Sequence, residues 1–224
     1  MKNRNAEFEK MRSGKLYNCT EKNILKKHVR ALWLCDRYNK SAIWNIPKRN
    51  FIIKRLIPNI APNFFIMTPL HVEYGCNLTV GKDFFSNFNC MFLDVATITI
   101  GDSVMLGPNV TLATPMHPLL AQERVIQEYP DGYHDLEYAK PIVIQDGVWI
   151  ASGATVCGGI TVGKNSIIGA GSVVTRDVPP NTLVAGVPAK VIRTLDEQDK
   201  IDVWETYCKN DIPLSAKDKM KTHS

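Results

Sequence analysis

A hydrophobic residue returns at every sixth position between residues 144 and 174. The third residue after each is Gly, Asn or Asp, the types that best tolerate a positive φ angle. Six steps of about 100° would spread the repeat over several helix faces, whereas an even period stays on one face of a strand. The pattern therefore predicts short strands joined by corners, with an inward row made of Ile144, Ile150, Val156, Val162, Ile168 and Val174.

The same period occurs earlier in the chain. It begins at Ile100 and ends at His117, and a looser set begins at Val80 and slips by two residues before Ile100. Short strands at a fixed period predict a solenoid. We therefore predict a mainly β protein in which residues 61–193 form triangular coils of three hexads, stacked about 4.8 Å apart.

Residues 118–141 interrupt the repeat with a polar segment directly after His117. An inserted loop of this length inside a compact domain is usually functional or disordered. Because it leaves the coils next to a histidine, we expect it to take part in a site.

The first 60 residues have a helical pattern instead. Thr20 is the predicted N-cap of a helix, and Pro47 opens a second helical stretch that Pro58 closes. We interpret residues 1–60 as a helical module, either a structural appendage or a contributor to the site, and residues 194–224 as a short helical tail. The apolar positions of the first of these helices are Ile24, Leu25, Val29, Leu32 and Trp33.

Composition places the chain among ordinary globular proteins. Of its 224 residues 45% are hydrophobic and 22% charged, and the net charge of +5 is too small to indicate nucleic-acid binding. The basic pairs at 26–27 and 48–49 are interpreted as solvated helix faces. No apolar run approaches the about 18 residues of a membrane helix, and we expect no secretory signal. We therefore expect neither a nucleic acid nor a membrane as a partner. Six scattered cysteines without a C-x-x-C pair indicate free thiols in a reducing cytoplasm.

Several motifs, in order, resemble those of the hexapeptide-repeat acyltransferases, and within them the maltose and galactoside O-acetyltransferases. They include Met-Arg-Ser-Gly-Lys-Leu-Tyr at 11–17, Tyr-Gly-Cys-Asn at 74–77, Phe-Phe-Ser-Asn-Phe-Asn at 84–89, Glu-Tyr-Ala-Lys-Pro at 137–141 and Ala-Gly-Val-Pro-Ala-Lys-Val-Ile-Arg at 185–193. The resemblance implies a left-handed parallel β-helix. It also implies transfer of an acetyl group from acetyl-CoA to a sugar or glycoside hydroxyl, by a homotrimer with active sites between subunits.

Acetyl transfer to a hydroxyl needs a base, a donor for the oxyanion and a groove for the carrier. We predict His117 as the base, because an imidazole titrates near neutral pH. Asn87 is the second predicted catalytic residue, at the thioester or oxyanion, although it could instead be a corner residue, as Asp94 could cap a turn. The predicted acceptor-binding residues are Asp94, Glu73, Asn18 and Glu137, and Glu137 or a backbone carbonyl could orient the His117 ring.

The resemblance assigns acetyl-CoA as the co-substrate and no metal. Cationic side chains suit the phosphates of acetyl-CoA, and small residues let its pantetheine chain lie against the protein backbone. Instead of binding phosphates, the basic residues could form a generic charged rim. Instead of packing on the cofactor, Trp149 could cover an interface. The predicted cofactor residues are Trp149, Ser152, Ala170, Thr175, Arg176, Lys190 and Arg193.

The chain departs from the family pattern at three places. Asn18 and Cys19 follow the Leu-Tyr pair where an aspartate is common, Glu73 stands where Ser or Asp is usual, and the loop is longer near residues 127–135. We expect these places to form the acceptor wall. The acceptor and its hydroxyl are not specified by the sequence.

Three other functions stay open at this point. The chain could be a hexapeptide-repeat acyltransferase acting on a glycan precursor, an amino sugar or a xenobiotic. A γ-type carbonic anhydrase has the same helix but needs three histidines on zinc, and beyond His117 only His71 and His134 lie near the coils. A non-catalytic β-solenoid would need neither the loop nor the polar residues.

Overall fold

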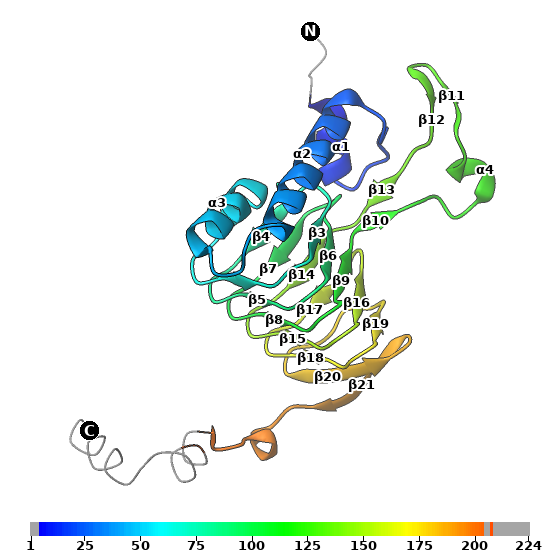
Figure 1. Cartoon of the computed structure of the whole chain (residues 1–224). Helices are drawn as coiled ribbons and strands as arrows, with labels where there is room; N and C mark the ends of the chain where they lie inside the picture. Colours follow the sequence, from blue (N-terminus) through cyan, green and yellow to red (C-terminus); the bar gives the residue numbers. More distant parts are fainter. Residues whose placement is uncertain (1–4, 204–206, 208–224) are drawn as a thin grey trace. The chain divides into compact units, whose positions relative to one another are not determined.

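The computed structural model describes residues 5–203 and 207, and the chain divides into two units, residues 1–194 and 195–224. Three helices open the first unit: α1 (Ala6–Arg12), α2 (Lys22–Asn39) and α3 (Ile46–Leu56) (Figure 1). The N-cap of α2 is Glu21, not the predicted Thr20, because its carboxylate accepts from the backbone N–H groups of Asn23 and Ile24. None of the described helices has the length and apolar character needed to cross a membrane.

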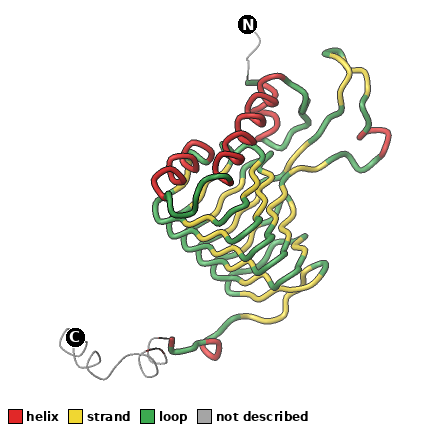
Figure 2. The backbone as a smooth tube through the Cα atoms, in the orientation of Figure 1, coloured by secondary structure: helices red, strands yellow, loops and turns green. Residues whose placement is uncertain are grey.

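The predicted left-handed parallel β-helix is confirmed, and its strands form three parallel sheets (Figures 1 and 2). Sheet I contains β1 (Asn59–Ile60), β4 (Leu78–Val80), β7 (Ile98–Ile100), β14 (Ile142–Ile144) and β17 (Thr161–Val162). Sheet II contains β2 (Phe65–Ile66), β5 (Phe85–Ser86), β8 (Met105–Leu106), β15 (Trp149–Ile150), β18 (Ile167–Ile168), β20 (Thr182–Gly186) and the antiparallel β21 (Ala189–Thr194). Sheet III contains β3 (Leu70–Val72), β6 (Cys90–Leu93), β9 (Thr111–Ala113), β16 (Thr155–Cys157) and β19 (Val173–Val174).

The chain visits sheets I, II and III in turn, so each coil has three edges, called I–II, II–III and III–I after the sheets they join. Ile144 pairs with Val162, 18 positions on, as three hexads require. Val80 pairs with Ile100, 20 positions on, which explains the two-residue slip in the sequence. The first coil starts at Asn59, two residues before the predicted boundary.

The six-residue register is confirmed by burial. All six aliphatic side chains of the inward row from Ile144 to Val174 are at most 1% exposed. Five of the six predicted corner residues have positive φ, and Asp177 is the exception. The Asp177 carboxylate accepts from the backbone N–H of Thr161 at 2.7 Å, so it braces the neighbouring coil without a left-handed backbone.

The segment between β9 and β14 is structured, so the predicted loop 118–141 is corrected to an arm with its own elements. Its base is a pair of antiparallel strands, β10 (Pro115–Met116) and β13 (Tyr138–Ala139). Beyond them lie α4 (Ala121–Arg124) and a hairpin of β11 (Gln127–Tyr129) and β12 (Gly132–His134). Ile100 still pairs with Ile144, so the arm is inserted without breaking the stack.

Helices α2 and α3 close the first coil. Tyr38 donates to the Ile66 carbonyl at 2.7 Å and Arg49 donates to the same oxygen at 2.9 Å. Asn39 pairs with both backbone groups of Leu70 at 2.8 Å. These strands have no further coil beyond them, and an unpaired strand edge recruits other strands. The helical module therefore caps the solenoid.

The second unit contains one described element, the 3₁₀ turn Glu197–Asp199, with Asp196 in a capping box. Residues 204–206 and 208–224 of the predicted helical tail lie outside the described residues.

Candidate active site

The arm brings Glu137 between the N-terminal loop and His117. Tyr17 and Glu137 exchange backbone hydrogen bonds of 3.0 and 3.2 Å, and the Tyr17 hydroxyl donates to Glu137 Oε2 at 2.7 Å. On the other side, β10 and β13 pair Pro115 with Ala139 and Met116 with Tyr138. The next pair in that register is His117 and Glu137. An exposed imidazole and a carboxylate thus lie on adjacent backbones at edge III–I.

Cys19 and two carboxylates converge beside this pair. The Cys19 thiol donates to Asp135 Oδ1 at 3.4 Å, and one ligand atom from each of Cys19, Asp135 and Glu137 lies within 4.8 Å of the others. Burial and the two carboxylates raise the pKa of Cys19 to about 12, so the sulfur is a protonated donor at neutral pH. Within residues 5–203 and 207 this is the one such group, and it contains no histidine.

Two further carboxyls lie at the same edge, one coil apart. Burial and then the neighbouring Glu137 carboxylate raise the pKa of Glu73 to about 7. Asp94 is fully buried, and burial raises its pKa to about 7 although its oxygens accept from the backbone N–H groups of Tyr74 at 2.7 Å and Asn77 at 3.2 Å. Each Asp94 oxygen thus accepts one backbone N–H of the same turn. These bonds support the turn interpretation, and the acceptor contact of Asp94 stays a prediction.

This turn also needs Gly75. Its φ is +73°, and a Cβ atom there would lie 2.2 Å from the carbonyl oxygen of Leu56. The close approach joins the end of α3 to the corner that carries Glu73, so the helical cap positions the edge as well as closing the solenoid.

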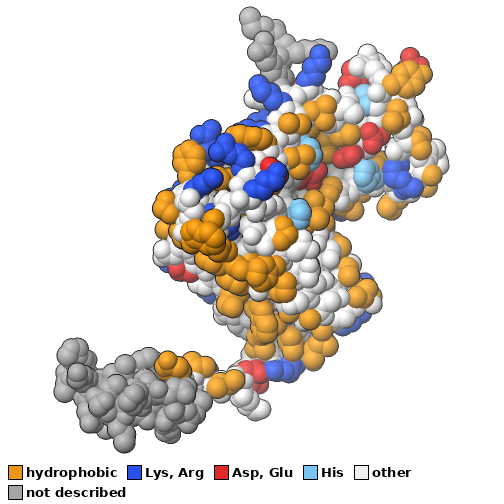
Figure 3. All heavy atoms as spheres, in the orientation of Figure 1, with side chains coloured by type: hydrophobic (Ala, Val, Ile, Leu, Met, Phe, Trp, Pro, Cys, Tyr) orange, Lys and Arg blue, Asp and Glu red, His pale blue; other side chains and the backbone are white. Residues whose placement is uncertain are grey.

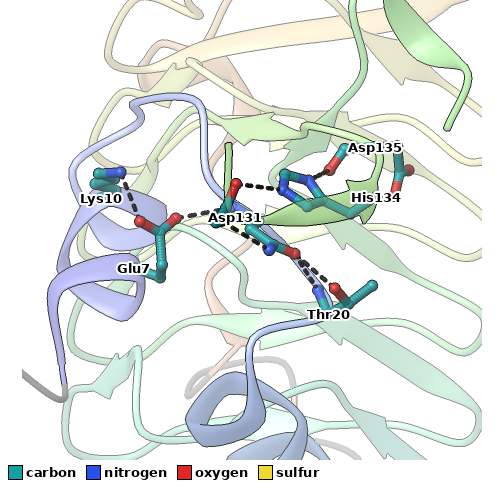
Figure 4. A network of polar contacts seen from close by, with 7 residues as sticks. Glu7, Lys10, Thr20, Asp131, His134 and Asp135 are labelled. Carbon is teal, nitrogen blue, oxygen red and sulfur yellow. Dashed lines mark hydrogen bonds and ion pairs between the residues drawn. The ribbon is translucent and has the colours of Figure 1, made fainter. Parts of the chain in front are cut away.

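The places where the sequence departs from the family pattern meet in space. Asn18 donates to Asp131 of the hairpin at 3.4 Å and accepts from Thr20. His134 bonds Asp131 at 3.0 Å and the Asp135 carbonyl at 2.9 Å, which raises the pKa of His134. Figure 4 shows the hairpin residues Asp131 and His134 next to Glu7 and Thr20 of the N-terminal segment. The hairpin and the N-terminal loop thus form one wall.

Other predicted residues lie at a different edge. Asn87, Ser152 and Ala170 occupy corners of edge II–III in three coils. The Asn87 Oδ1 accepts from the Phe88 backbone N–H at 2.7 Å, leaving its amide nitrogen for a ligand. Ser152 is exposed, and its backbone N–H has no partner within the described residues. A free N–H is what an oxyanion donor requires.

The predicted cofactor residues divide between these edges and sheet II. Thr175 and Arg176 follow β19 at edge III–I, and Arg176 and Lys190 line one cavity of about 180 Å³. Arg193, exposed on β21, is opposite Leu183. Trp149 is 47% exposed in an outward ladder between Met105 and Ile167.

Two hollows adjoin edge III–I. One, of about 200 Å³, lies between α2 and sheet III and is lined by His28, His71, Glu73 and Met91 among others. The other, of about 470 Å³, lies under the arm and is lined by Leu16, Pro118, Gln127 and Tyr138 among others. Sequence analysis did not single out Tyr17 or His28. Tyr17 lay inside a recognised motif, but its bond to Glu137 spans 120 positions and leaves no local signal.

Two family models match the chain. The "Maltose acetyltransferase hexapeptide capping motif" matches residues 10–61, and "Bacterial transferase hexapeptide (six repeats)" matches residues 141–176. The first match covers the end of α1 and all of α2 and α3, and the second covers coils after the arm.

Relatives extend over nearly the whole chain. A galactoside O-acetyltransferase of Escherichia coli is 37% identical over 199 residues, 89% of this chain and 94% of the relative. Among solved structures, a maltose O-acetyltransferase from Clostridium difficile matches with a TM-score of 0.80 and 40% identity, over 87% of this chain and 100% of that one. A galactoside acetyltransferase in complex with coenzyme A matches with a TM-score of 0.79 and 37% identity, over 86% and 92%.

Proposed function

Because this chain belongs to the maltose and galactoside O-acetyltransferase family of hexapeptide-repeat acyltransferases, we propose that it transfers an acetyl group from acetyl-CoA to a hydroxyl of a sugar or glycoside. The observation that supports this most is the register of the arm base, in which His117 follows the last pair and faces Glu137. A base next to a polar wall is the arrangement that acceptor activation needs.

In the proposed reaction His117 takes the proton of the acceptor hydroxyl as its oxygen attacks the thioester carbonyl carbon. The Glu137 carboxylate, held by Tyr17, orients the imidazole and stabilises its protonated form. The C–S bond then breaks, and the imidazolium returns the proton to the leaving CoA sulfur. General-base catalysis of this kind contributes about 10²–10⁴-fold.

The oxyanion and the carrier belong to the other edge. The free Ser152 N–H and the Asn87 amide nitrogen are the proposed donors to the developing charge. Ala170 leaves room for the pantetheine arm beside them. Arg176, Lys190 and Arg193 are the proposed phosphate contacts.

The separation of the edges supports a homotrimer with shared sites. Asn87 precedes β6 and His117 follows the neighbouring β9, so a whole strand of sheet III lies between them. The four residues of β6 alone span about 13 Å at about 3.3 Å per residue, far beyond hydrogen-bond reach. Edge II–III of one subunit must therefore meet edge III–I of another for the two residues to share a substrate.

A cationic acceptor such as an amino sugar is the second candidate. Glu73, Asp135 and Glu137 give the acceptor wall an excess of carboxylates. The cations Arg176 and Lys190 line a separate cavity at the end of the coils. An ammonium group would lower the pKa of Glu73 and pair with it. The cytoplasm is the proposed compartment, because the five described cysteines are free thiols.

The test is a thiol-release assay with acetyl-CoA against a panel of neutral sugars, glycosides and amino sugars. We expect at least one panel member to raise thiol release well above the rate without acceptor, and His117→Ala to lower that turnover about 10³-fold with the fold intact. His223→Ala is the matched control. A folded His117→Ala variant with a near-native rate would rule out the assignment.

A further inference from the structure

The charge of the chain is concentrated in the helical cap. Residues 22–56 contain ten Lys or Arg and one acidic residue, a formal charge of +9. The rest of the chain contains 17 basic and 21 acidic residues, a formal charge of −4. One of the ten, Arg49, is buried against Tyr38 and serves the fold. The other basic residues of this segment form a strongly positive surface. The interpretation of 48–49 as a solvated helix face is wrong for Arg49, which is buried.

The same surface also carries exposed apolar side chains. Of the five positions that predicted the first helix, only Ile24 is buried, and the other four are about half exposed. At about 100° per residue, the exposed Leu25, Val29, Leu32 and Trp33 lie within an arc of about 100° on α2, apart from its buried stripe. Lys26, Arg30 and Arg37 lie along one side of this arc, and Lys22 lies within it. Helix α2 thus has a second apolar stripe that nothing in the described chain covers.

Aromatic side chains extend this stripe onto α3. Trp44 is 81% exposed and Phe51 is 60% exposed. The Arg37 guanidinium lies 4.7 Å from the Trp33 ring, and that of Arg55 lies 5.4 Å from the Phe51 ring. Figure 3 shows hydrophobic atoms interspersed with Lys and Arg over this part of the molecule.

We propose that this helical face docks on a phospholipid membrane with anionic headgroups. Lysines and arginines beside an apolar, Trp-containing stripe are what an interfacial helix presents to such a surface. Each cation close to an anionic leaflet strengthens binding about fivefold. Within the described residues, the one carboxylate that pairs with a cation of this segment is Asp36, 2.7 Å from Lys40. Among the exposed cations, Lys22, Lys26, Lys48 and Lys54 have no carboxylate partner within the described residues and can contact headgroups.

Two other occupants fit less well. A nucleic acid would match the charge, but protein–nucleic acid interfaces are more polar than a stripe of Leu25, Val29 and Leu32. A second copy pairing through the same face would bring two segments of +9 together. A trimer neighbour would instead meet this chain through the edges of sheet III, and light scattering of the variants tests whether it also covers the stripe. A membrane satisfies both the charge and the apolar stripe. This contrasts with the absence of a membrane partner expected from the sequence, and it involves neither His117 nor Asn87.

The experiment is vesicle flotation of the purified full chain, with vesicles of phosphatidylcholine alone or mixed with phosphatidylglycerol. We expect flotation with the mixed vesicles, loss of flotation at high salt, and little with phosphatidylcholine alone. Trp33→Ser combined with Phe51→Ser, and Lys26→Glu combined with Lys54→Glu, should each weaken binding at least tenfold. Ile201→Ser and Lys200→Glu are matched exposed controls that should bind as the unchanged protein does.

Three results would overturn the proposal. They are no flotation with mixed vesicles at low salt, equal weakening by the controls, and release from the vesicles by a stoichiometric amount of single-stranded RNA. Light scattering of each variant detects a fourth result that would overturn the proposal. If the variants that lose flotation also lose their oligomeric state, the face is a contact between copies of the chain. Acetyl transfer is measured in the same preparations. The membrane proposal is judged by flotation and the proposed function by acetyl transfer, so the failure of one is distinguished from the failure of the other.

Discussion

At the scale of single residues, burial raises the pKa of two carboxyls at edge III–I. Glu73 and Asp94 both have a pKa raised to about 7, yet their environments differ. Asp94 is held by two backbone N–H groups, whereas Glu73 lines an open hollow beside Glu137. The same direction of shift therefore marks a structural carboxyl in one case and a candidate ligand-binding carboxyl in the other.

The shift of Glu73 predicts a pH-dependent stability. Its folded pKa of about 7 is above the unfolded value near 4.3, so the folded state holds the proton more tightly between those pH values. Stability therefore falls as pH rises through this window. We expect Glu73→Gln to raise the free energy of unfolding by about 1 kcal/mol or more at pH 8, and to change it little near pH 4.

Urea unfolding at both pH values checks this prediction. The exposed Glu128→Gln variant is the control, and it should differ little from the unchanged protein at either pH. An equal gain from Glu73→Gln at pH 4 and pH 8 would mean that the effect comes from packing and not from ionisation.

Arg176 makes a second prediction at this scale. It shares a cavity with Lys190 at the end of the coils, where the proposed phosphate contacts lie. Loss of a charge-assisted hydrogen bond costs about 1.5–3 kcal/mol. Arg176→Ala should therefore raise the KM for acetyl-CoA about tenfold or more and leave the KM for the acceptor nearly unchanged. Steady-state kinetics with Lys164→Ala as the exposed control measures both constants, and an unchanged KM for acetyl-CoA would place the phosphates elsewhere.

At the scale of elements, the coils were predictable because their register is local. A strand of two or three residues alternates inward and outward, so the row from Ile144 to Val174 could be assigned from spacing alone. The faces of α2 could not be assigned that way. That helix has two apolar stripes, and only the tertiary contacts of the first coil determine that the one with Leu34 and Tyr38 faces inward.

The arm was predictable as an interruption but not as a structure. Its hairpin is short and polar, so no hydrophobic alternation marks β11 and β12. The hairpin is held by hydrogen bonds to the distant N-terminal loop, from Asn18 to Asp131 and from Cys19 to Asp135. Contacts across more than a hundred positions leave no periodic trace in a sequence.

The arm carries a prediction about acceptor choice. Replacing residues 127–135 with a short turn removes Asp131 and Asp135 from the wall but leaves His117 and the coils in place. Transfer to the preferred acceptor should fall far more than hydrolysis of acetyl-CoA, which should stay within about tenfold, because a polar site strongly rejects poorly matched partners. Both rates come from one preparation with its oligomeric state checked. A parallel loss of both would assign the hairpin to the catalytic machinery.

At the scale of the whole molecule, the two proposed catalytic residues do not meet within one chain. Sequence reasoning placed His117 and Asn87 in one reaction, and the fold puts them at opposite ends of sheet III. The sequence contains no signal for this separation, because it depends on which corner each hexad turns. If the reaction needs both residues, the edges of two subunits must complete each site.

This predicts complementation between two inactive variants. Mixed and reassembled subunits of His117→Ala and Asn87→Ala contain some interfaces with an intact Asn87 on one side and an intact His117 on the other. If each site of a cyclic trimer takes one residue from each of two neighbours, random mixing of equal amounts should restore about one quarter of the full activity. Sites contained within one chain would stay inactive in the mixture. Mixing unchanged protein with the double variant discriminates as well, since shared sites would retain about one quarter of the activity and single-chain sites about one half.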